Sequence, residues 1–559
     1  MTPTLDPVND DPKGDIVQAE EARAAAFGTP EPVIDHESNQ KGHHSKIYLD
    51  DAAAVLEAGG GSVQYTTAES KRVLRKVDLW VCVPMCIIYT IQNMDKQSLS
   101  YAAVFNLQAE THLVGTEYSW LTSAVYCIQL VAQPLSSYAL VVFPVKYWVM
   151  FNYFAWSACL TCLAAAHNFT GLLVGRILLG GFEATILPAF ILISQMWWTR
   201  REQSYRTVAY LIANSIASII GPILAYGIGH ATQRIHAYQA IFLSLGAISI
   251  GIQPLVWFML PNSPATAKFL RHGNDRLIAV ERLRENNTGT KTSKWKWHQF
   301  WEAVRDLKTW GWTLMMICTT LPAGAIGSFG GLITQGFGFN SFQTILMQIP
   351  TGVIGIITLL AGIFLTNRFK IRWPILAFLC LPCIAGAAGL IRVSRSNLRG
   401  LMATYYITWF LAGIQPLLFA WANLNAAGTT KRVVTTAAMF GGSCIGNIVG
   451  PQLYFSWEAP TYHTGLYCDI AAWSLLCVLC VAMGFHLRHL NAKQAKRRVA
   501  LGLPIDILDM SIMSLEEASA YKVALSQQLL EQGFDEARLY EHSFDDMTDF
   551  ENPTFIYVW

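Results

Sequence analysis

The chain alternates between long apolar runs and short polar connections over most of its length. Between Val77 and Leu487, most residues fall into runs of roughly 20 apolar residues, the length at which a helix crosses the hydrocarbon core of a bilayer. Helices are the expected spanning form, because an open strand would leave its backbone groups unpaired in lipid. The pattern predicts twelve spans, at residues 77–99, 118–142, 145–166, 170–196, 206–230, 238–260, 310–333, 341–366, 372–392, 400–423, 433–456 and 466–487.

The connections divide these spans into two sets of six. A polar loop at 261–309 separates a first bundle at 71–260 from a second at 310–490, and polar tails cover 1–70 and 491–559. Lysine and arginine gather in the tails, the central loop and alternate connections, so the positive-inside rule places both termini in the cytosol. The first tail lacks the apolar core of a signal peptide and is expected to be a disordered cytoplasmic segment.

Three segments outside the spans carry predictions of their own. Asn262–Arg284 has the pattern of an amphipathic helix in the central loop. Ser514 and Glu517 form a capping box ahead of a second amphipathic helix that extends to Gln532. The acidic end, Phe544–Trp559, is expected to lack fixed structure.

Composition supports a membrane protein and excludes other classes. The 559 residues are 53% hydrophobic and 14% charged, against about 25% charged in soluble domains. The clustering of the apolar residues into long runs decides the class, and it excludes a nucleic-acid-binding protein, a secreted disulfide scaffold and a classical soluble enzyme. The net charge of +2 indicates no particular partner. The twelve cysteines lie within predicted spans, where packing between helices is their expected role.

The two halves share a weak internal repeat. Span five contains Gly221-Pro222, and span eleven contains Gly450-Pro451, 229 residues later and at the same depth. Proline interrupts the helical hydrogen-bond ladder and glycine admits a close neighbour, so both spans are expected to kink and to pack tightly.

Basic turns repeat as well. Lys146 lies between spans two and three, and Arg368 lies between spans eight and nine. Two six-helix halves with corresponding kinked helices and basic turns are typical of transporters whose substrate site lies near mid-membrane between the bundles. Rocking of the bundles then exposes the site to each side in turn.

Few ionisable residues fall within the spans, and a charge at the bilayer centre costs about 2.5–3.5 kcal/mol. In span four, Arg176 and Glu183 are seven residues apart, about two helical turns, and share a face. Asp95 and Lys96 lie in the outer half of span one. We interpret the two carboxylates as proton acceptors and the two cations as attractants for an anionic substrate. The alternatives are structural ion pairs and, for Arg176, snorkelling to the interface.

The second half is nearly free of charge within its spans, so its candidate ligands are amides. Asn423, Asn447 and Gln335 are predicted substrate contacts, with helix packing as the alternative for each. Tyr126 of span two completes the predicted binding set.

Several motifs around these residues resemble the major facilitator superfamily, and in particular the fungal allantoate permease family of anion:cation symporters. The resemblance extends over residues 70–559 and rests on Met94–Ala102, Tyr118–Leu121, Gly175-Arg176, Phe182–Ala184, Met196–Trp198 with Arg201–Gln203 and Arg206-Thr207, Gly446–Pro451 and Met547–Pro553. It departs from the superfamily pattern at Val142–Lys146, where an acidic and basic turn is expected.

The resemblance implies an all-α membrane protein with two six-helix bundles. We expect no enzymatic activity, because no His/Asp metal cluster and no nucleophile–base set appears within the predicted spans. The resemblance also implies proton-coupled import of a small organic anion such as allantoate, nicotinate or pantothenate, driven by the proton gradient without a cofactor. In the symporter group, an acid–base pair in span one and an Arg and Glu in span four are associated with this chemistry, and Asp95-Lys96 and Arg176/Glu183 match.

We therefore expect a monomeric, multi-pass protein of the plasma membrane, with the vacuolar membrane as the alternative. Its expected partners are the anion, protons and the bilayer, without nucleic acid or metal. Two other functions stay open: a proton antiporter that exports an acidic metabolite, and a nutrient sensor that does not transport.

Overall fold

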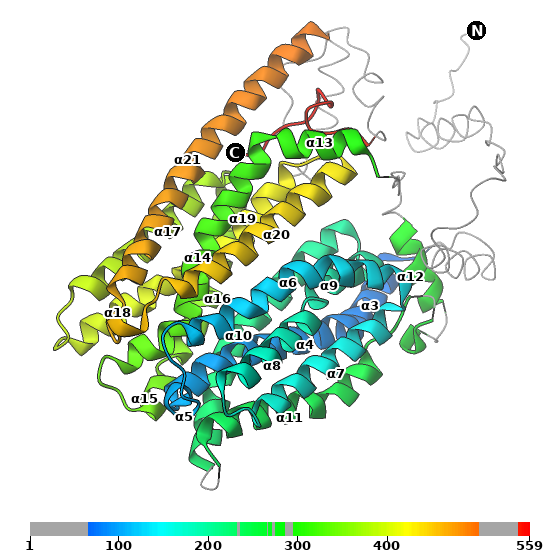
Figure 1. Cartoon of the computed structure of the whole chain (residues 1–559). Helices are drawn as coiled ribbons and strands as arrows, with labels where there is room; N and C mark the ends of the chain where they lie inside the picture. Colours follow the sequence, from blue (N-terminus) through cyan, green and yellow to red (C-terminus); the bar gives the residue numbers. More distant parts are fainter. Residues whose placement is uncertain (1–64, 232–234, 265, 271–273, 285–294, 502–545) are drawn as a thin grey trace, which may run out of the picture. The chain divides into compact units, whose positions relative to one another are not determined.

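The structure, a computed structural model, describes residues 65–231, 235–264, 266–270, 274–284, 295–501 and 546–559. Helices form each of the twelve predicted spans (Figure 1). The first six are α3–η1–α4 (Thr67–Val77, Asp78–Cys82, Val83–Val104), α6 (Glu117–Val142), α7 (Val145–Leu163), α8–α9 (Phe169–Glu183, Ile186–Trp197), α10 (Arg200–Ala231) and α11 (Ala237–Met259). The second six are α14 (Leu307–Gln335), α15–α16 (Ser341–Leu346, Ile349–Phe369), α17 (Trp373–Arg392), α18–η4–α19 (Leu398–Thr408, Trp409–Gly413, Ile414–Leu424), α20 (Thr429–Gln452) and α21 (His463–Ala500). Short helices occupy the connections: α5 (Leu107–Glu110), η2 (Lys268–Leu270), α12 (Asp275–Arg284), α13 (Trp297–Arg305) and η5 (Ser456–Glu458).

Ten of the helical segments in the described part of the chain are long and apolar enough to cross a membrane. The other two spans, α4 and α7, carry more polar side chains but pack within the first half. The helix α4 lies against α10 and α11, and α7 lies against α8 and α11. The prediction of two six-helix halves is confirmed.

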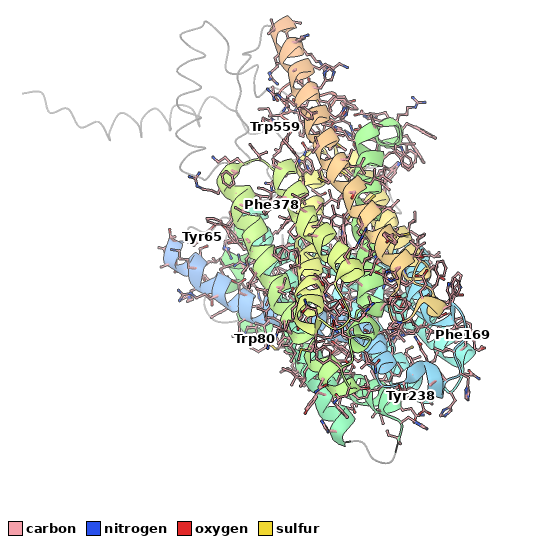
Figure 2. All side chains as sticks on the ribbon, turned by 90° about the vertical axis from the view of Figure 1, so that its left-hand side faces the viewer. Tyr65, Trp80, Phe169, Tyr238, Phe378 and Trp559 are labelled. Carbon is pink, nitrogen blue, oxygen red and sulfur yellow. The ribbon has the colours of Figure 1, made fainter. Side chains whose placement is uncertain are left out.

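The described chain has two ends that we name distal and proximal. The distal end holds the connections at 105–116, 336–340 and 453–462, and the proximal end holds α12, α13 and residues 546–559. Figure 2 shows Phe169 and Tyr238, where α8 and α11 begin, together at the distal end and Trp559 far from them. The hydroxyl of Tyr238 donates to the carbonyl of Ala166 at 3.4 Å, which joins two distal connections.

Proline explains where four of the spans are interrupted. A proline has no N–H for the carbonyl four residues earlier, and its ring clashes with that carbonyl. The interruptions in spans one, four and ten include the residue four positions before Pro84, Pro188 and Pro416, as a π-turn, a break and a 3₁₀ turn. In span eight the break follows directly after Leu346, which is four positions before Pro350. Other prolines, such as Pro322, stand within helices that continue.

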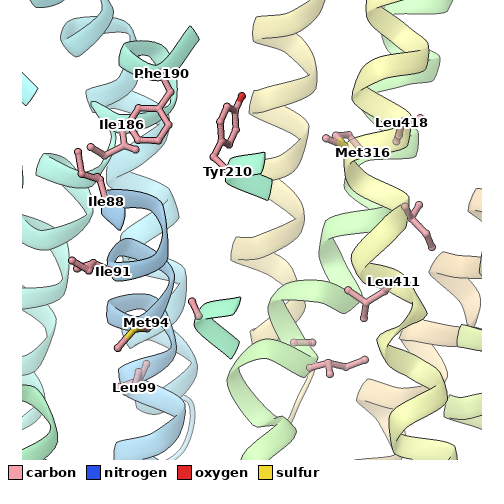
Figure 3. Close-up of a cluster of buried hydrophobic side chains, with 14 of the residues drawn as sticks. Ile88, Ile91, Met94, Leu99, Ile186, Phe190, Tyr210, Met316, Leu411 and Leu418 are labelled. Atoms are coloured by element: carbon pink, nitrogen blue, oxygen red, sulfur yellow. The ribbon is translucent and has the colours of Figure 1, made fainter. Parts of the chain in front are cut away.

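Buried apolar side chains of both halves form one core. Figure 3 shows Ile88, Ile91 and Phe190 on helices of the first half and Met316 and Leu418 on helices of the second. All five side chains are at most 5% exposed.

The two halves of the predicted repeat do place proline at equal depth. Pro222 stands 22 residues after Arg200, the first residue of α10, and Pro451 stands 22 residues after Thr429, the first residue of α20. The helix α10 continues beyond its proline to Ala231, whereas α20 ends one residue after Pro451.

Glycines allow α20 to lie almost in contact with the backbone of α14. A Cβ added at Gly442 would stand 2.7 Å from the carbonyl oxygen of Thr313, and one at Gly450 would overlap the carbonyl oxygen of Leu321. The packing interpretation of Gly450 is consistent with this approach. Gly441, on the same helix, has only Leu130 within 4 Å of such an atom, at 3.9 Å.

Two predictions for the segments outside the spans are wrong. The helix predicted for Asn262–Arg284 begins only at Asp275, because Pro264 and the turn before it hold the chain in bends and a short 3₁₀ segment. Phe544–Trp559 was expected to lack fixed structure, but residues 546–559 are ordered against the second half, with Thr548, Asp549 and Tyr557 buried. The predicted helix of 514–532 lies outside the described residues.

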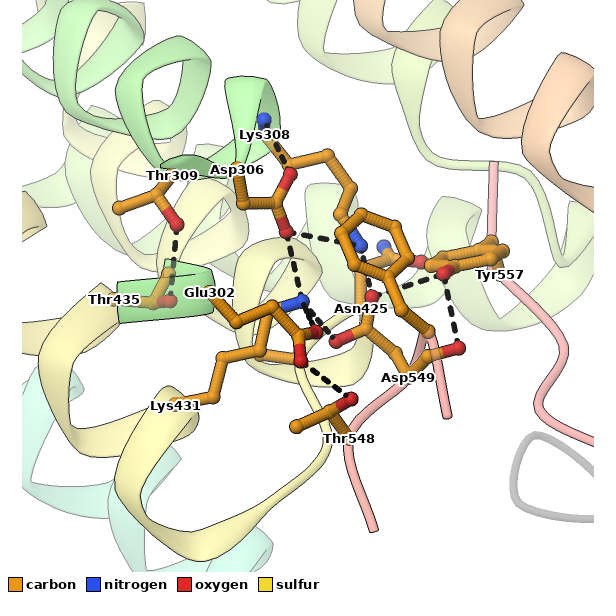
Figure 4. A network of polar contacts seen from close by, with 12 residues as sticks. Glu302, Asp306, Lys308, Thr309, Asn425, Lys431, Thr435, Thr548, Asp549 and Tyr557 are labelled. Carbon is orange, nitrogen blue, oxygen red and sulfur yellow. Dashed lines mark hydrogen bonds and ion pairs between the residues drawn. The ribbon is translucent and has the colours of Figure 1, made fainter. Parts of the chain in front are cut away.

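The C-terminal segment is held by two buried lysines (Figure 4). Asp549 forms ion pairs with Lys308 at the start of α14 and with Lys431 on α20, the latter at 2.7 Å. Lys431 also pairs with Glu302 at 2.8 Å and with Asp306 at 2.9 Å. Burial alone would raise the pKa of Asp549, but the two ammonium groups hold that pKa below its ordinary value.

Backbone hydrogen bonds complete the attachment of this segment. Asn425 exchanges two hydrogen bonds with the backbone of Val558, at 2.8 and 2.9 Å, and Asn491 exchanges two with Tyr557, at 2.7 and 2.8 Å. The carbonyl of Trp559 accepts from the backbone N–H of Arg372 at 3.2 Å. The segment therefore joins the proximal ends of α14, α17, α19, α20 and α21.

The first half has a corresponding attachment from α12. Asp275 accepts from Arg72 and Lys76 of α3, both at 2.6 Å, and Arg282 pairs with Glu202 of α10. Burial favours a higher pKa for Asp275, yet the two cations lower it. The central loop thus joins the proximal ends of spans one and five.

We predict that Gly450→Ala destabilises the protein by about 1–3 kcal/mol, because the added methyl group must displace backbone of α14. Denaturant or thermal unfolding of the purified protein measures the change. Gly441→Ala is the matched control and should leave stability unchanged or slightly raised. Equal effects of the two substitutions would contradict the close packing at Gly450.

We also predict that Asp549→Asn lowers stability by about 3 kcal/mol, because it removes one partner from two buried ammonium groups. The wild-type protein should lose this contribution in acid, as the pH falls from the ordinary pKa of an aspartate through the lowered pKa of Asp549. Asp549→Asn should lack that part of the acid dependence.

Glu551→Gln, on the same segment but 42% exposed, is the control and should change stability little. Thermal melting across a pH series distinguishes the two variants. If acid lowers the melting temperature of the wild type and of Asp549→Asn by the same amount, the carboxylate contributes no stability.

Candidate transport site

Glu183 is the last residue of α8, at the break that Pro188 produces in span four. Its carboxyl is buried. Gln129 Nε2 of α6 donates to Glu183 Oε2 at 3.4 Å, and Gln92 Nε2 of α4 donates to the Glu183 backbone carbonyl at 3.5 Å. Oε1 of Glu183 has no hydrogen-bond partner in the described structure. The break thus presents a carboxylate that retains one free acceptor atom.

Lys96 of α4 lies opposite this carboxylate. Its Nζ is 3.9 Å from Glu183 Oε2, and its side chain is 34% exposed, whereas that of Glu183 is fully covered. Lys96 also interacts electrostatically with Tyr89 and Tyr126 of the first half and with Cys444 of α20. The predicted residues Lys96, Glu183 and Tyr126 are therefore brought together, beside a helix of the second half.

Asp95 points in another direction from its neighbour Lys96, because successive helical residues are about 100° apart. It is buried, and its Oδ2 accepts from Trp156 Nε1 of α7 at 3.0 Å. Ser249 Oγ of α11 lies 3.5 Å from both oxygens. Asp95 and Lys96 thus form no ion pair with each other, and Asp95 faces the interior of the first half.

Arg176 is buried rather than extended to an interface, with 3% of its surface exposed. Its guanidinium lies over the ring of Phe242, 5.8 Å from the centroid, and interacts electrostatically with Tyr118, Asp95 and Glu183. Nη2 has no hydrogen-bond partner in the described structure. A guanidinium that keeps a free donor can bind a carboxylate.

The predicted amides of the second half make their hydrogen bonds with groups other than Lys96, Glu183 and Arg176. Asn447 donates to the Ser443 carbonyl of its own helix at 2.8 Å and packs against Gly324, so its contacts are those of a packing amide. Asn423 is exposed and accepts a hydrogen bond from Thr436 of α20. Thr436 precedes Cys444, the residue of α20 near Lys96, by eight residues, which is about 12 Å along the helix. Gln335 donates to the Val104 carbonyl at 3.3 Å, at the distal end.

The predicted packing and gating residues differ in their contacts. Gly221 lies against Tyr101, whose hydroxyl would stand 2.6 Å from an added Cβ, so it brings α4 and α10 together. Lys146 lies over the ring of Trp257 at 5.0 Å. Arg368 is exposed at the proximal end of α16.

Within the described residues, the hydrogen bonds between the two halves gather toward the distal end. Tyr118 Oη donates to the Ser328 carbonyl at 2.8 Å, and Ser341 Oγ donates to the Val104 carbonyl at 2.9 Å. The others are Ser123 to the Ile448 carbonyl, Ser328 to Thr122, Gln335 to the Val104 carbonyl, Gln452 to Ser123, and Ser456 to the Gly115 carbonyl. The halves are therefore joined on the distal side of Lys96 and Glu183.

One buried carboxyl of the second half, that of Asp469 in α21, is not among the predicted site residues, and neither are the partners Gln129 and Trp156. Asp469 is fully buried and accepts from Tyr454 at 2.6 Å. A lone aspartate in the apolar run 466–487 was a visible signal for it. The partners gave no such signal, since amides and tryptophans are common in spans. In the described part of the chain, no three His, Cys, Asp or Glu side chains could hold a metal ion.

The profile of the Major Facilitator Superfamily matches residues 85–451. The chain belongs to this superfamily. An uncharacterized transporter of Schizosaccharomyces pombe is 34% identical over 510 residues, 91% of each chain. The allantoate permease of Saccharomyces cerevisiae is 27% identical over 562 residues, covering 95% of this chain and 94% of that protein.

Solved structures share the superfamily fold. A bacterial homologue of the human lysosomal transporter Spinster, crystallised in an inward-facing and unoccupied conformation, has a TM-score of 0.56 and 13% identity, over 75% of this chain and 97% of its own. The resemblance to the allantoate permease family is confirmed, and the protein is a multi-pass membrane transporter of this superfamily rather than an enzyme.

Proposed function

We propose that this transporter imports a small organic anion together with protons. The contact of Lys96 with Glu183 carries the proposal, because a half-buried cation and a buried carboxylate meet where the two halves adjoin. An allantoate permease among its relatives supports a small carboxylate as substrate.

The pair can exchange partners. While Glu183 is ionised, Lys96 is its counter-ion. A proton on the free Oε1 neutralises Glu183 and leaves the Lys96 ammonium in need of an anion, which the substrate carboxylate supplies. The loaded site is then neutral, so the halves can rock without moving an unpaired charge through lipid.

Arg176 and Asp95 have supporting roles in this proposal. Arg176 Nη2 is free to donate to the same anion or to draw it toward Lys96. Asp95 offers a second acid whose hydrogen bonds from Trp156 and Ser249 fix its position in the first half.

The proximal end faces the cytosol in this proposal, as the positive-inside rule favours. The structure, joined at its distal end, then corresponds to an inward-facing state of a monomeric transporter in the plasma membrane. An exporter of an acidic metabolite would use the same pair, and the direction of net flux under an imposed proton gradient separates the two.

We predict that Glu183→Gln abolishes proton-driven accumulation while retaining part of the exchange of substrate across the membrane. The neutral amide keeps the shape but can no longer gain or lose a proton. Uptake and counterflow in proteoliposomes measure the two activities, with radiolabelled candidate carboxylates such as allantoate and nicotinate.

Glu110→Gln, at a 41% exposed carboxyl beside His236, is the control and should accumulate substrate like the wild type. Full accumulation by Glu183→Gln would remove this carboxyl from proton coupling.

We predict that Arg176→Ala weakens anion binding at least tenfold at every pH. A tenfold change corresponds to about 1.4 kcal/mol of binding free energy, which is the loss expected when a buried charge-assisted hydrogen bond is removed. Arg176→Lys should retain part of the affinity, because the charge remains but the forked donor is lost. Ligand-induced thermal stabilisation by a carboxylate and by its amide measures the effect. Equal affinity in wild type and Arg176→Ala would make this arginine structural.

A further inference from the structure

Asp469 is a buried acid without a cation beside it. It lies six residues into α21 and is fully buried. In the part of the chain that the structure describes, no lysine, arginine or histidine nitrogen lies within 4.0 Å of it. Its Oδ2 accepts from the Tyr454 hydroxyl at 2.6 Å, and its Oδ1 has no hydrogen-bond partner. Asp275, Asp549 and Glu183 each have a cationic partner, so Asp469 differs from them.

Three aromatic rings in contact connect this acid to the interface between the halves. The Tyr454 ring lies 5.2 Å from that of Phe329, and Phe329 meets Tyr118 of the first half edge-on at 5.1 Å. Tyr118 also donates its hydroxyl across the interface to the Ser328 carbonyl. The path from the interface to Asp469 is thus three contacts long and consists of buried side chains.

The other titratable groups around this path are few. Cys468 precedes Asp469 on α21 and interacts electrostatically with it and with Glu458. Tyr462 packs against Tyr454 at 5.6 Å, and Tyr405 interacts electrostatically with Tyr454. The remaining groups are Arg176, which faces Tyr118, and the exposed His230, whose ring stacks on Phe342 at 4.0 Å between the halves.

We propose that Asp469 is a second proton-binding site, which keeps its proton while the distal contacts are closed and exchanges it with water when they open. In the closed state an ionised carboxylate would be buried with a single hydroxyl donor and no counter-ion, which is costly. Separation of Tyr118 from Phe329 loosens the aromatic cover and lets water solvate the ionised form.

The sign of the coupling follows from this difference. The closed state binds the proton more tightly than the open state, so lower pH favours distal closure. One linked proton changes the ratio of closed to open molecules by at most about tenfold per pH unit. This inference rests on the proposed proton coupling, since it gives the second half a protonation step that precedes inward opening.

Hydrogen–deuterium exchange of the full-length protein in nanodiscs tests the proposal without labels. We expect peptides that cover 105–118 and 453–466 to exchange several-fold more slowly at pH 5 than at pH 7.5, after correction for intrinsic rates. In Asp469→Asn the same peptides should exchange slowly at both pH values. Tyr454→Phe removes a donor that stabilises the ionised form, so the midpoint of the pH response should move upward. A merely structural role of Tyr454 would instead raise exchange equally at all pH values and overturn the proposal.

Two controls separate this proposal from the others. Glu183→Gln should keep the distal pH response, and His230→Gln should keep it as well. A wild-type protein with no pH response, or an Asp469→Asn protein that keeps it, overturns the assignment of Asp469. A failure of proton coupling at Glu183 appears instead in the uptake assays, where Glu183→Gln would accumulate substrate normally.

Discussion

An ionised group withdrawn from water costs several kcal/mol unless partners replace the lost hydration. At the proximal end, buried charged groups each have several oppositely charged partners. Lys431 has three carboxylates within 2.9 Å, and Asp275 has two cations at 2.6 Å. Within the spans the condition is met only in part, since Lys96 and Glu183 are 3.9 Å apart and Arg176 keeps a free donor. The well-paired charges hold each half together, and the poorly paired ones are those that a proton or an anion can still satisfy.

Each half is fastened at its proximal end by a segment from outside the membrane. In the first half α12 contacts α3 and α10, and in the second half residues 546–559 contact helices from α14 to α21. The contacts named for each attachment lie within one half, so each is compatible with movement of that half as a rigid unit. The hydrogen bonds between halves lie on the distal side instead, where they must break for that side to open.

The spans could be predicted from the sequence because a long apolar run in a bilayer has essentially one solution, a helix. Glu183 and Lys96 could be singled out as candidates for a related reason, since a charge in such a run must have a partner or a task. Their contact with each other was not predicted, because the sequence grouped Lys96 with Asp95 and Glu183 with Arg176. The direction in which the Asp95 side chain points could not be predicted. Neighbouring residues of a helix point about 100° apart, so Asp95 and Lys96 face different surroundings. The C-terminal attachment was also invisible, since Asp549 meets Lys308 across 241 positions and acidic composition alone suggests a free tail.

The break in span four has an electrostatic consequence. Since α8 ends at Glu183 and α9 begins at Ile186, the ends of two helix macrodipoles lie near the middle of span four. The negative end of α8 is beside the carboxyl and attracts a proton or an ammonium, whereas the positive end of α9 attracts an anion. A single proline therefore gives an apolar helix partial charges of both signs at the depth where the two halves meet.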